Sequence, residues 1–432
     1  MLKFQSNPPK TEFGSLFNHF NGEWELLLVA LDKLKDGVVL SEDVRDTNGR
    51  LLLTKGNPID ANQIRLLKIW GVPEVQIQES DQAVESEKSE IDADSRLKIE
   101  RTVQTICQHI DTGHPAINLI YNTAIEYRCQ KGLFIDFGPR QPLPENFKLD
   151  LYNGLKTQIH FSEVQLPESP AIISEFNQIV DDPMSSANDI AAVVSRSPSL
   201  AALLLKIANS AAYGFPSKID TLSHAVAILG TREVGVLAMV ISSVQFFGDI
   251  PKELIDMSTF LRHSLACGLL SRILAAQAKI QHTERLFLAG LLHDIGRLVW
   301  YRYFPEQAKL VLNMAKSTGL SVYEIEKECM GISHTQIAGY LLRKWKFPDT
   351  LVNGIIFHHR PMRSPEPLEP SIVHMADIGI NALGLGHSGG HIIPHFDPRG
   401  WHQLGVAPGA MKTALDQTVQ QLDIMTELFA GF

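Results

Sequence analysis

An almost uninterrupted helical pattern from residue 166 to about residue 360 is the feature that most constrains the fold of this chain. Apolar residues recur there at helical spacing, and short loops containing Gly, Pro or Asp separate the expected helices. The sequence of this stretch lacks the strict alternation of apolar and polar residues that indicates strands. Such a run predicts one compact all-α domain.

Histidines and aspartates recur in these expected helices and in the one that follows them. His263 shares a helix face with Phe260 and Cys267, and apolar residues extend the face of His334. The set comprises His263, His293, Asp294, His334, His358, His359 and Asp377. Buried imidazoles and carboxylates without partners are costly, so we expect the set to cluster, with or without a metal.

A helical bundle can build a metal site in its core from such inward-facing side chains. The mixed nitrogen and oxygen donors suit a divalent transition metal, namely Fe, Mn, Zn or Ni. Such a metal would polarise a phosphoryl oxygen and acidify a water molecule. Arg297, one turn after His293, could donate to a phosphate in a bidentate way. Taken one at a time, the same residues also fit a simpler description as satisfied polar groups of the core.

Composition narrows the class of protein. The chain has 432 residues, a net charge of -9 and dispersed Lys and Arg, which disfavours binding to duplex nucleic acid. It has four cysteines and no C-x-x-C pair, which favours a reducing compartment. Neither a signal peptide nor a run of about 20 apolar residues is recognisable. We therefore expect a cytoplasmic protein without a membrane segment.

Four regions are expected along the chain. Residues 1–80 form a small β-rich module, in which the Asn48-Gly49 pair indicates a hairpin turn. Residues 81–165 combine an acidic linker with a helical connector that breaks into two helices near Pro115. Residues 166–363 form the helical domain, and residues 364–432 form a C-terminal helical extension.

Two other patterns are interpreted as structural. Residues 384–389 fit G-x-G-x-x-G, but a helix precedes them where a dinucleotide fold needs a strand. We predict that the loop holding His387, His391, His395 and Asp397 lies on the surface. Asn209 and Ser210 are expected to end a helix, because no G-x-S-x-G elbow surrounds them.

Specific motifs carry a resemblance to a known family. GLLHDIGRL, with RHS before it and SHTQIAGYLL and then HH after it, resembles the HD superfamily of metal-dependent phosphohydrolases. LPESP, SRSPSLAALLLKIANSAAYG and HAVAILGTREV extend a closer likeness to the HDOD domain, the HD-related output domain of bacterial signalling proteins. The N-terminal module resembles the small domain that precedes some HD-GYP and HDOD domains.

The resemblance implies an all-α HD-like fold, a role in bacterial signal transduction and metal ligands at all the positions of the His/Asp set. HDOD domains are generally regarded as having lost hydrolase activity. The Gly-Tyr-Pro motif of the cyclic di-GMP phosphodiesterases is absent after His359, and Arg297 stands where those enzymes have Lys.

Three functions follow as alternatives. The helical domain could be a non-catalytic output that binds a signalling protein partner, with a cluster that is structural or holds a stabilising metal. It could instead be a metal-dependent phosphohydrolase acting on a nucleotide or phosphodiester, with Arg297 as the phosphate contact. It could also sense a nucleotide without turning it over.

Overall fold

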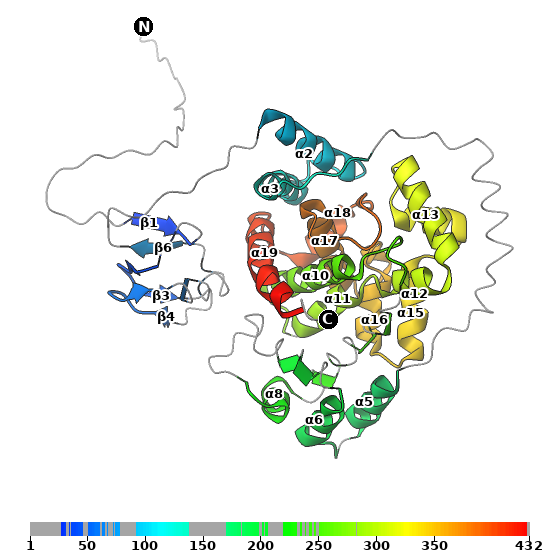
Figure 1. Ribbon diagram of the computed structural model, residues 1–432, viewed down its shortest axis with the longest axis horizontal. Helices are drawn as coiled ribbons and strands as arrows, with labels where there is room; N and C mark the ends of the chain where they lie inside the picture. The colour runs from blue at the N-terminus through cyan, green and yellow to red at the C-terminus, as the bar shows by residue number, and fades with distance from the viewer. Residues whose placement is uncertain are drawn as a thin grey trace, which may run out of the picture. The chain divides into compact units, whose positions relative to one another are not determined.

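The computed structural model of the chain is mainly helical (Figure 1). The residues that it describes are 27–31, 34, 36–45, 51–60, 63, 64, 67, 72, 74–77, 92–137, 170–182, 184–197, 201, 202, 204, 205, 219–230, 234, 235, 238, 242, 243, 246, 247, 250–281 and 283–429. The chain divides into two compact units, Met1–Ser86 and Glu87–Phe432. The predicted fold class, a helical protein with a small β-containing module at its N-terminus, is confirmed.

The smaller unit is built from short antiparallel strand pairs. They are β1 Leu27–Ala30 with β6 Glu74–Ile77, β2 Val38–Val39 with β5 Pro58–Ile59, and β3 Val44–Arg45 with β4 Leu51–Leu53. Leu40, Ile59 and Ile77 are almost fully buried and form its core. The predicted turn at Asn48 and Gly49 lies outside the described residues, between two strands that pair as a hairpin requires.

The larger unit is mainly helical in its described residues. Its α-helices are α2 Ala93–Ile106, α3 Pro115–Lys131, α5 Ala171–Asp181, α6 Ala187–Ser195, α8 Leu222–Leu229, α10 Met257–Gln277, α11 Thr283–Leu292, α12 Ile295–Tyr303, α13 Pro305–Thr318, α14 Val322–Ile325, α15 His334–Lys344, α16 Asp349–Ile356, α17 Leu368–Leu383, α18 Pro398–Leu404 and α19 Gly409–Phe429. A π-helical turn, η2, spans Glu326–Met330, and a 3-10 turn, η3, spans Pro361–Arg363. The predicted break before Pro115 is confirmed. No described helix combines the length and apolar character needed to cross a membrane.

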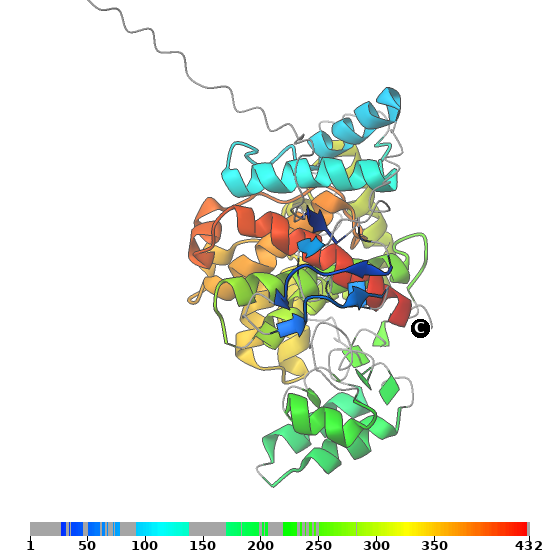
Figure 2. The ribbon, with the colours of Figure 1, turned by 90° about the vertical axis from the view of Figure 1, so that its left-hand side faces the viewer.

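Helix α10 is the centre of this unit, and α11, α17 and α19 pack along it. Figures 1 and 2 show α2 and α3 at one end of the helical unit and α5, α6 and α8 at the other. Asp256 caps the start of α10, because its carboxylate accepts a hydrogen bond from the backbone N–H of Thr259 at 3.0 Å. The central helix therefore begins at a defined residue, which fixes where its inward-facing side chains lie.

Glycines allow α10 and α11 to approach closely. A Cβ added to Gly290 would lie 2.6 Å from the carbonyl oxygen of Cys267 and 2.8 Å from the Cα of Gly268. Both separations are shorter than side chains tolerate, so only glycine fits at position 290. The close approach brings the end of α11 next to His263.

We predict opposite effects for two helical Gly→Ala substitutions. Gly290→Ala should lower the free energy of unfolding by about 2 kcal/mol, because the new methyl group would push α10 and α11 apart. Gly354→Ala in α16 is the matched control, since its Cβ would meet only the Cβ of Ala289, at 3.5 Å. It should be neutral or stabilise by up to about 1 kcal/mol through helix propensity. Urea denaturation measures both, and equal effects would contradict this packing.

Candidate metal centre

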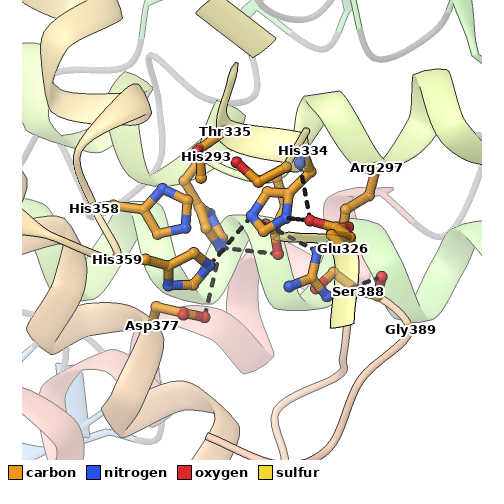
Figure 3. A network of polar contacts seen from close by, with 12 residues as sticks. His293, Arg297, Glu326, His334, Thr335, His358, His359, Asp377, Ser388 and Gly389 are labelled. Atoms are coloured by element: carbon orange, nitrogen blue, oxygen red, sulfur yellow. Dashed lines mark hydrogen bonds and ion pairs between the residues drawn. The ribbon is translucent and has the colours of Figure 1, made fainter. Parts of the chain in front are cut away.

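All the predicted His and Asp residues converge on one place in the helical unit. His263 lies within α10 and Asp377 within α17, while His334 is the first residue of α15. His293 and Asp294 connect α11 to α12, and His358 and His359 follow the end of α16. Figure 3 shows side chains of this set facing one another across the space between these helices. Each of these residues is at most 6% exposed.

One half of the cluster gathers around His263. Its Nε2 atom lies 3.4 Å from Nε2 of His293 and 3.4 Å from Oδ1 of Asp377. Asp377 Oδ1 is also 3.5 Å from Nε2 of His293. The Sγ atom of Cys267, one turn along α10, is 3.7 Å from His263 Nε2. These donor atoms lie within 4.8 Å of one another, close enough to hold one metal ion together.

The other half gathers around Asp294 and His334. Asp294 Oδ1 lies 3.0 Å from Nε2 of His334, and His359 Nε2 lies 3.2 Å from the same nitrogen. With His358, these donors also fall within 4.8 Å of one another. Asp294 joins the halves, because its Oδ2 is 3.2 Å from Nε2 of His293. The cluster therefore offers two adjacent groups of metal donors.

The outer ring nitrogens of three histidines have fixed partners. His293 Nδ1 donates to the carbonyl of Gly290 at 2.7 Å, and His358 Nδ1 donates to the carbonyl of Ile355 at 2.6 Å. His334 Nδ1 donates to a carboxylate oxygen of Glu326 at 2.6 Å. Since each Nδ1 carries the donated proton, each Nε2 faces the cluster, as in histidines that bind metals.

The charges of the cluster balance only partly. Burial would lower the pKa of His293, but Asp294 and hydrogen bonds to Asp294 and Asp377 outweigh it and raise this pKa to about 10. Burial and repulsion from His293 lower the pKa of His358 to about 3. Burial disfavours ionised Asp294, yet Arg297 and His293 hold its pKa well below the usual range. At neutral pH, ionised carboxylates thus face a neutral His358, whose Nε2 has no hydrogen-bond partner among the described residues.

Arg297 extends the cluster towards the loop after α17. Its Nε lies 3.2 Å from Asp294 Oδ1, and its Nη1 donates to Oγ of Ser388 at 3.0 Å. The hydroxyl of Tyr301 donates to the backbone carbonyl of Ser388 at 2.6 Å. The guanidinium that we expected to meet a phosphate therefore meets the chain's own Ser388 (Figure 3).

The prediction of a surface loop at residues 387–397 is wrong for its first part. Burial, followed by repulsion from His391, lowers the pKa of His387 to about 3. Ser388 is only 3% exposed, whereas the side chain of His395 is 71% exposed. Glycine explains the difference: at Gly386, φ is +82°, and a Cβ there would lie 2.4 Å from the carbonyl oxygen of Thr259. The backbone can therefore lie directly on α10 and close over the cluster.

Sequence patterns did not identify three residues that contribute to the cluster or contact Arg297 beside it. Glu326 is 2% exposed and accepts from both the backbone N–H and the ring of His334, at 2.8 and 2.6 Å. It lies in η2, a π-helical turn that helical spacing does not predict. Cys267 follows His263 by one turn, and this spacing could have identified it. Ser388 carried no recognisable signal, because its role depends on the path of the loop.

A family model for the HDOD domain matches residues 166–361. An uncharacterized protein of Treponema pallidum (strain Nichols) is 26% identical over 214 residues, which make up 49% of this chain and 41% of that protein. This chain therefore covers less than half the length of that relative.

Two solved structures share the fold. A Shewanella amazonensis SB2B protein, named provisionally as a phosphohydrolase, gives a TM-score of 0.50 at 23% identity, covering 62% of this chain and 96% of that one. A Marinobacter aquaeolei VT8 protein, named provisionally as a signal transduction protein, gives a TM-score of 0.50 at 21% identity, covering 71% and 72%. At such identities the likeness shows the fold alone.

We predict that Gly386→Ala destabilises the protein more than Gly405→Ala. Both glycines have positive φ, +82° and +64°, so alanine is strained by about 1 kcal/mol at either position. Only at Gly386 would the new Cβ strike neighbouring backbone, which should add about 2 kcal/mol. Chemical denaturation of the two variants measures the difference. Equal losses would mean that the loop does not press on α10.

Proposed function

Since residues 166–361 form an HDOD domain, we propose that this chain is a bacterial signalling protein whose helical domain is a regulatory output that binds a protein partner. Its His/Asp cluster holds a divalent transition metal, Fe, Mn, Zn or Ni, which stabilises the helical core. One observation carries this proposal: a complete set of metal donors lies at most 6% exposed beneath a loop of the same chain.

The donor set fits such a metal. Imidazole nitrogens and carboxylate oxygens are ligands that these ions accept. Three Nε2 atoms face inward because their Nδ1 atoms already donate elsewhere. A bound cation would compensate the charges of Asp294 and Asp377, and it would give His358 Nε2 the partner that it lacks. Binding would also displace the proton of His293, so the metal affinity should rise with pH.

Burial of the cluster favours a structural role for the metal over turnover. A substrate phosphate would need both a path to the cluster and the guanidinium of Arg297. Ser388 occupies one side of that guanidinium, and Tyr301 holds the backbone of Ser388 in place. With the loop in this position, the domain presents its outer surface, and not its metal site, to other molecules.

A metal-dependent phosphohydrolase is the second candidate, and the intact donor set with Arg297 favours it. A metal bound there would polarise a phosphoryl oxygen of a nucleotide or phosphodiester. Arg297 would bind and orient the phosphate by bidentate donation, after Ser388 had moved away. The same residues would serve a nucleotide sensor that lacks turnover.

We predict near-stoichiometric transition metal in the purified protein. Elemental mass spectrometry should find it in the wild type and lose it in Asp294→Ala, which removes the carboxylate shared by the two donor groups. His402→Ala is the control, because His402 is exposed on α18, outside the cluster. If the wild type took up no Mn, Fe, Zn or Ni on reconstitution, the metal site would be rejected.

Removal of the metal should lower the free energy of unfolding, and the metal-loaded protein should show no phosphohydrolase activity. At a free metal concentration of 100 times Kd, binding adds about 2.7 kcal/mol to the free energy of unfolding. Chelation should remove this increment from the wild type and leave Asp294→Ala unchanged. The loaded protein should release no product from nucleoside monophosphates or bis(p-nitrophenyl) phosphate. Product release by the wild type, abolished in an Asp294→Ala variant of undiminished stability, would establish the phosphohydrolase instead.

A further inference from the structure

A cavity of about 560 Å³ lies beside the loop that closes the cluster. Helices α3 and α10, the end of α17 and the loop residues Gly386, His387 and His391 line it. Its volume falls within the range of about 300–1,000 Å³ that is usual for small-molecule sites. None of the predicted metal ligands lines this cavity, so it is separate from the candidate metal centre.

Positive charge gathers on one side of this cavity. Arg128 and Lys131 project from neighbouring turns of α3, and Arg262 projects from α10. Neither aspartate nor glutamate occurs among the described lining residues. Arg262 does have an acidic partner, because its Nη2 lies 3.6 Å from Oδ1 of Asp423, which is outside the lining. Lys131 is exposed and forms no ion pair with a described residue.

Arg128 is the most informative of these cations. Its side chain is 2% exposed, and it donates to the carbonyls of Ala382 at 2.7 Å and Asn381 at 3.2 Å. These carbonyls belong to the last turn of α17, so Arg128 also caps that helix. They carry no net charge, and no described carboxylate forms an ion pair with this guanidinium. A buried cation without a counter-charge is costly, and an anion in the adjoining cavity would compensate it.

Another part of the lining is apolar and aromatic. Leu133, Phe134 and Ile135 follow the end of α3, and Phe134 stays 53% exposed. A large aromatic side chain held half in solvent offers a face on which a planar ring can stack. His391, whose pKa burial and the charge of Arg128 lower to about 4, is neutral at pH 7 and available for hydrogen bonds.

We propose that this cavity binds a nucleoside monophosphate, that is, a phosphate monoester carried on an aromatic base. Arg128, Lys131 and Arg262 hold the phosphate, and Phe134 packs against the base. The cavity lies at the border of the HDOD match at residues 166–361: Thr259 and Arg262 of α10 belong to that range, whereas the lining residues from α3, α17 and the following loop lie outside it. It does not depend on the metal site.

Calorimetric titration of the full chain tests this proposal, using AMP, GMP, CMP and UMP with adenosine and inorganic phosphate for comparison. The protein is first treated with chelator, and Asp294→Ala is titrated in parallel, so that binding through a metal is excluded. At least one of the monophosphates should bind, and more tightly than either adenosine or phosphate. Lys131→Glu should weaken that binding about tenfold, as expected for a lost charged hydrogen bond.

Matched variants make the outcome decisive. Lys309→Glu, with the same charge change on an exposed residue of α13 outside this lining, should leave the Kd unchanged. Phe134→Ala should weaken binding of the nucleotide and not that of phosphate. The proposal is overturned if no monophosphate binds at millimolar concentration, if Lys131→Glu and Lys309→Glu behave alike, or if binding disappears in chelated protein and in Asp294→Ala. The last result would assign binding to the cluster.

Discussion

The buried carboxylate of Asp294 is the constraint on which this helical unit depends. Its oxygens lie 3.2 Å from His293 in the same connection, 3.2 Å from Arg297 in α12 and 3.0 Å from His334 at the start of α15. A carboxylate this deep in a protein is tolerated only where positive or donating groups surround it. The helices that carry those groups are therefore held at fixed positions, and the close approach of α10 and α11 at Gly290 belongs to the same arrangement.

The loop after α17 connects features that lie far apart in the sequence. Ser388 accepts hydrogen bonds from Arg297 and Tyr301 of α12, while the backbone of Gly386 contacts α10 beside His263. The same loop provides His387 and His391 to the neighbouring cavity. A single glycine-rich segment thus closes the cluster on one side and forms a wall of the cavity on the other. Any ligand or partner that moved this segment would act on both places together.

The sequence predicted the helical fold and the members of the cluster because both depend on local patterns. Apolar spacing marks each helix, and the motifs around His293 and His334 mark residues that converge in the structure. The contribution of Glu326 was not predictable in this way, because the residue lies in a π-helical turn, whose spacing differs from that of an α-helix, and bonds to His334 eight residues away. The path of residues 385–393, in which Leu385, Ser388 and Ile393 are buried, was missed for a related reason: glycines usually mark exposed turns, and here Gly386 lies directly on α10. The cavity beside Arg128 joins residues from distant segments, which no local pattern reports.

We propose that these converging side chains hold a metal. Anomalous diffraction from crystals grown with the reconstituted metal, recorded on both sides of its absorption edge, tests this claim most directly. We expect an anomalous peak inside the cluster, with Nε2 of His358 bonded to the metal and Ser388 still in contact with Arg297. The metal site would be rejected if protein reconstituted with metal gave no such peak and Asp294 contacted His293 and His334 directly.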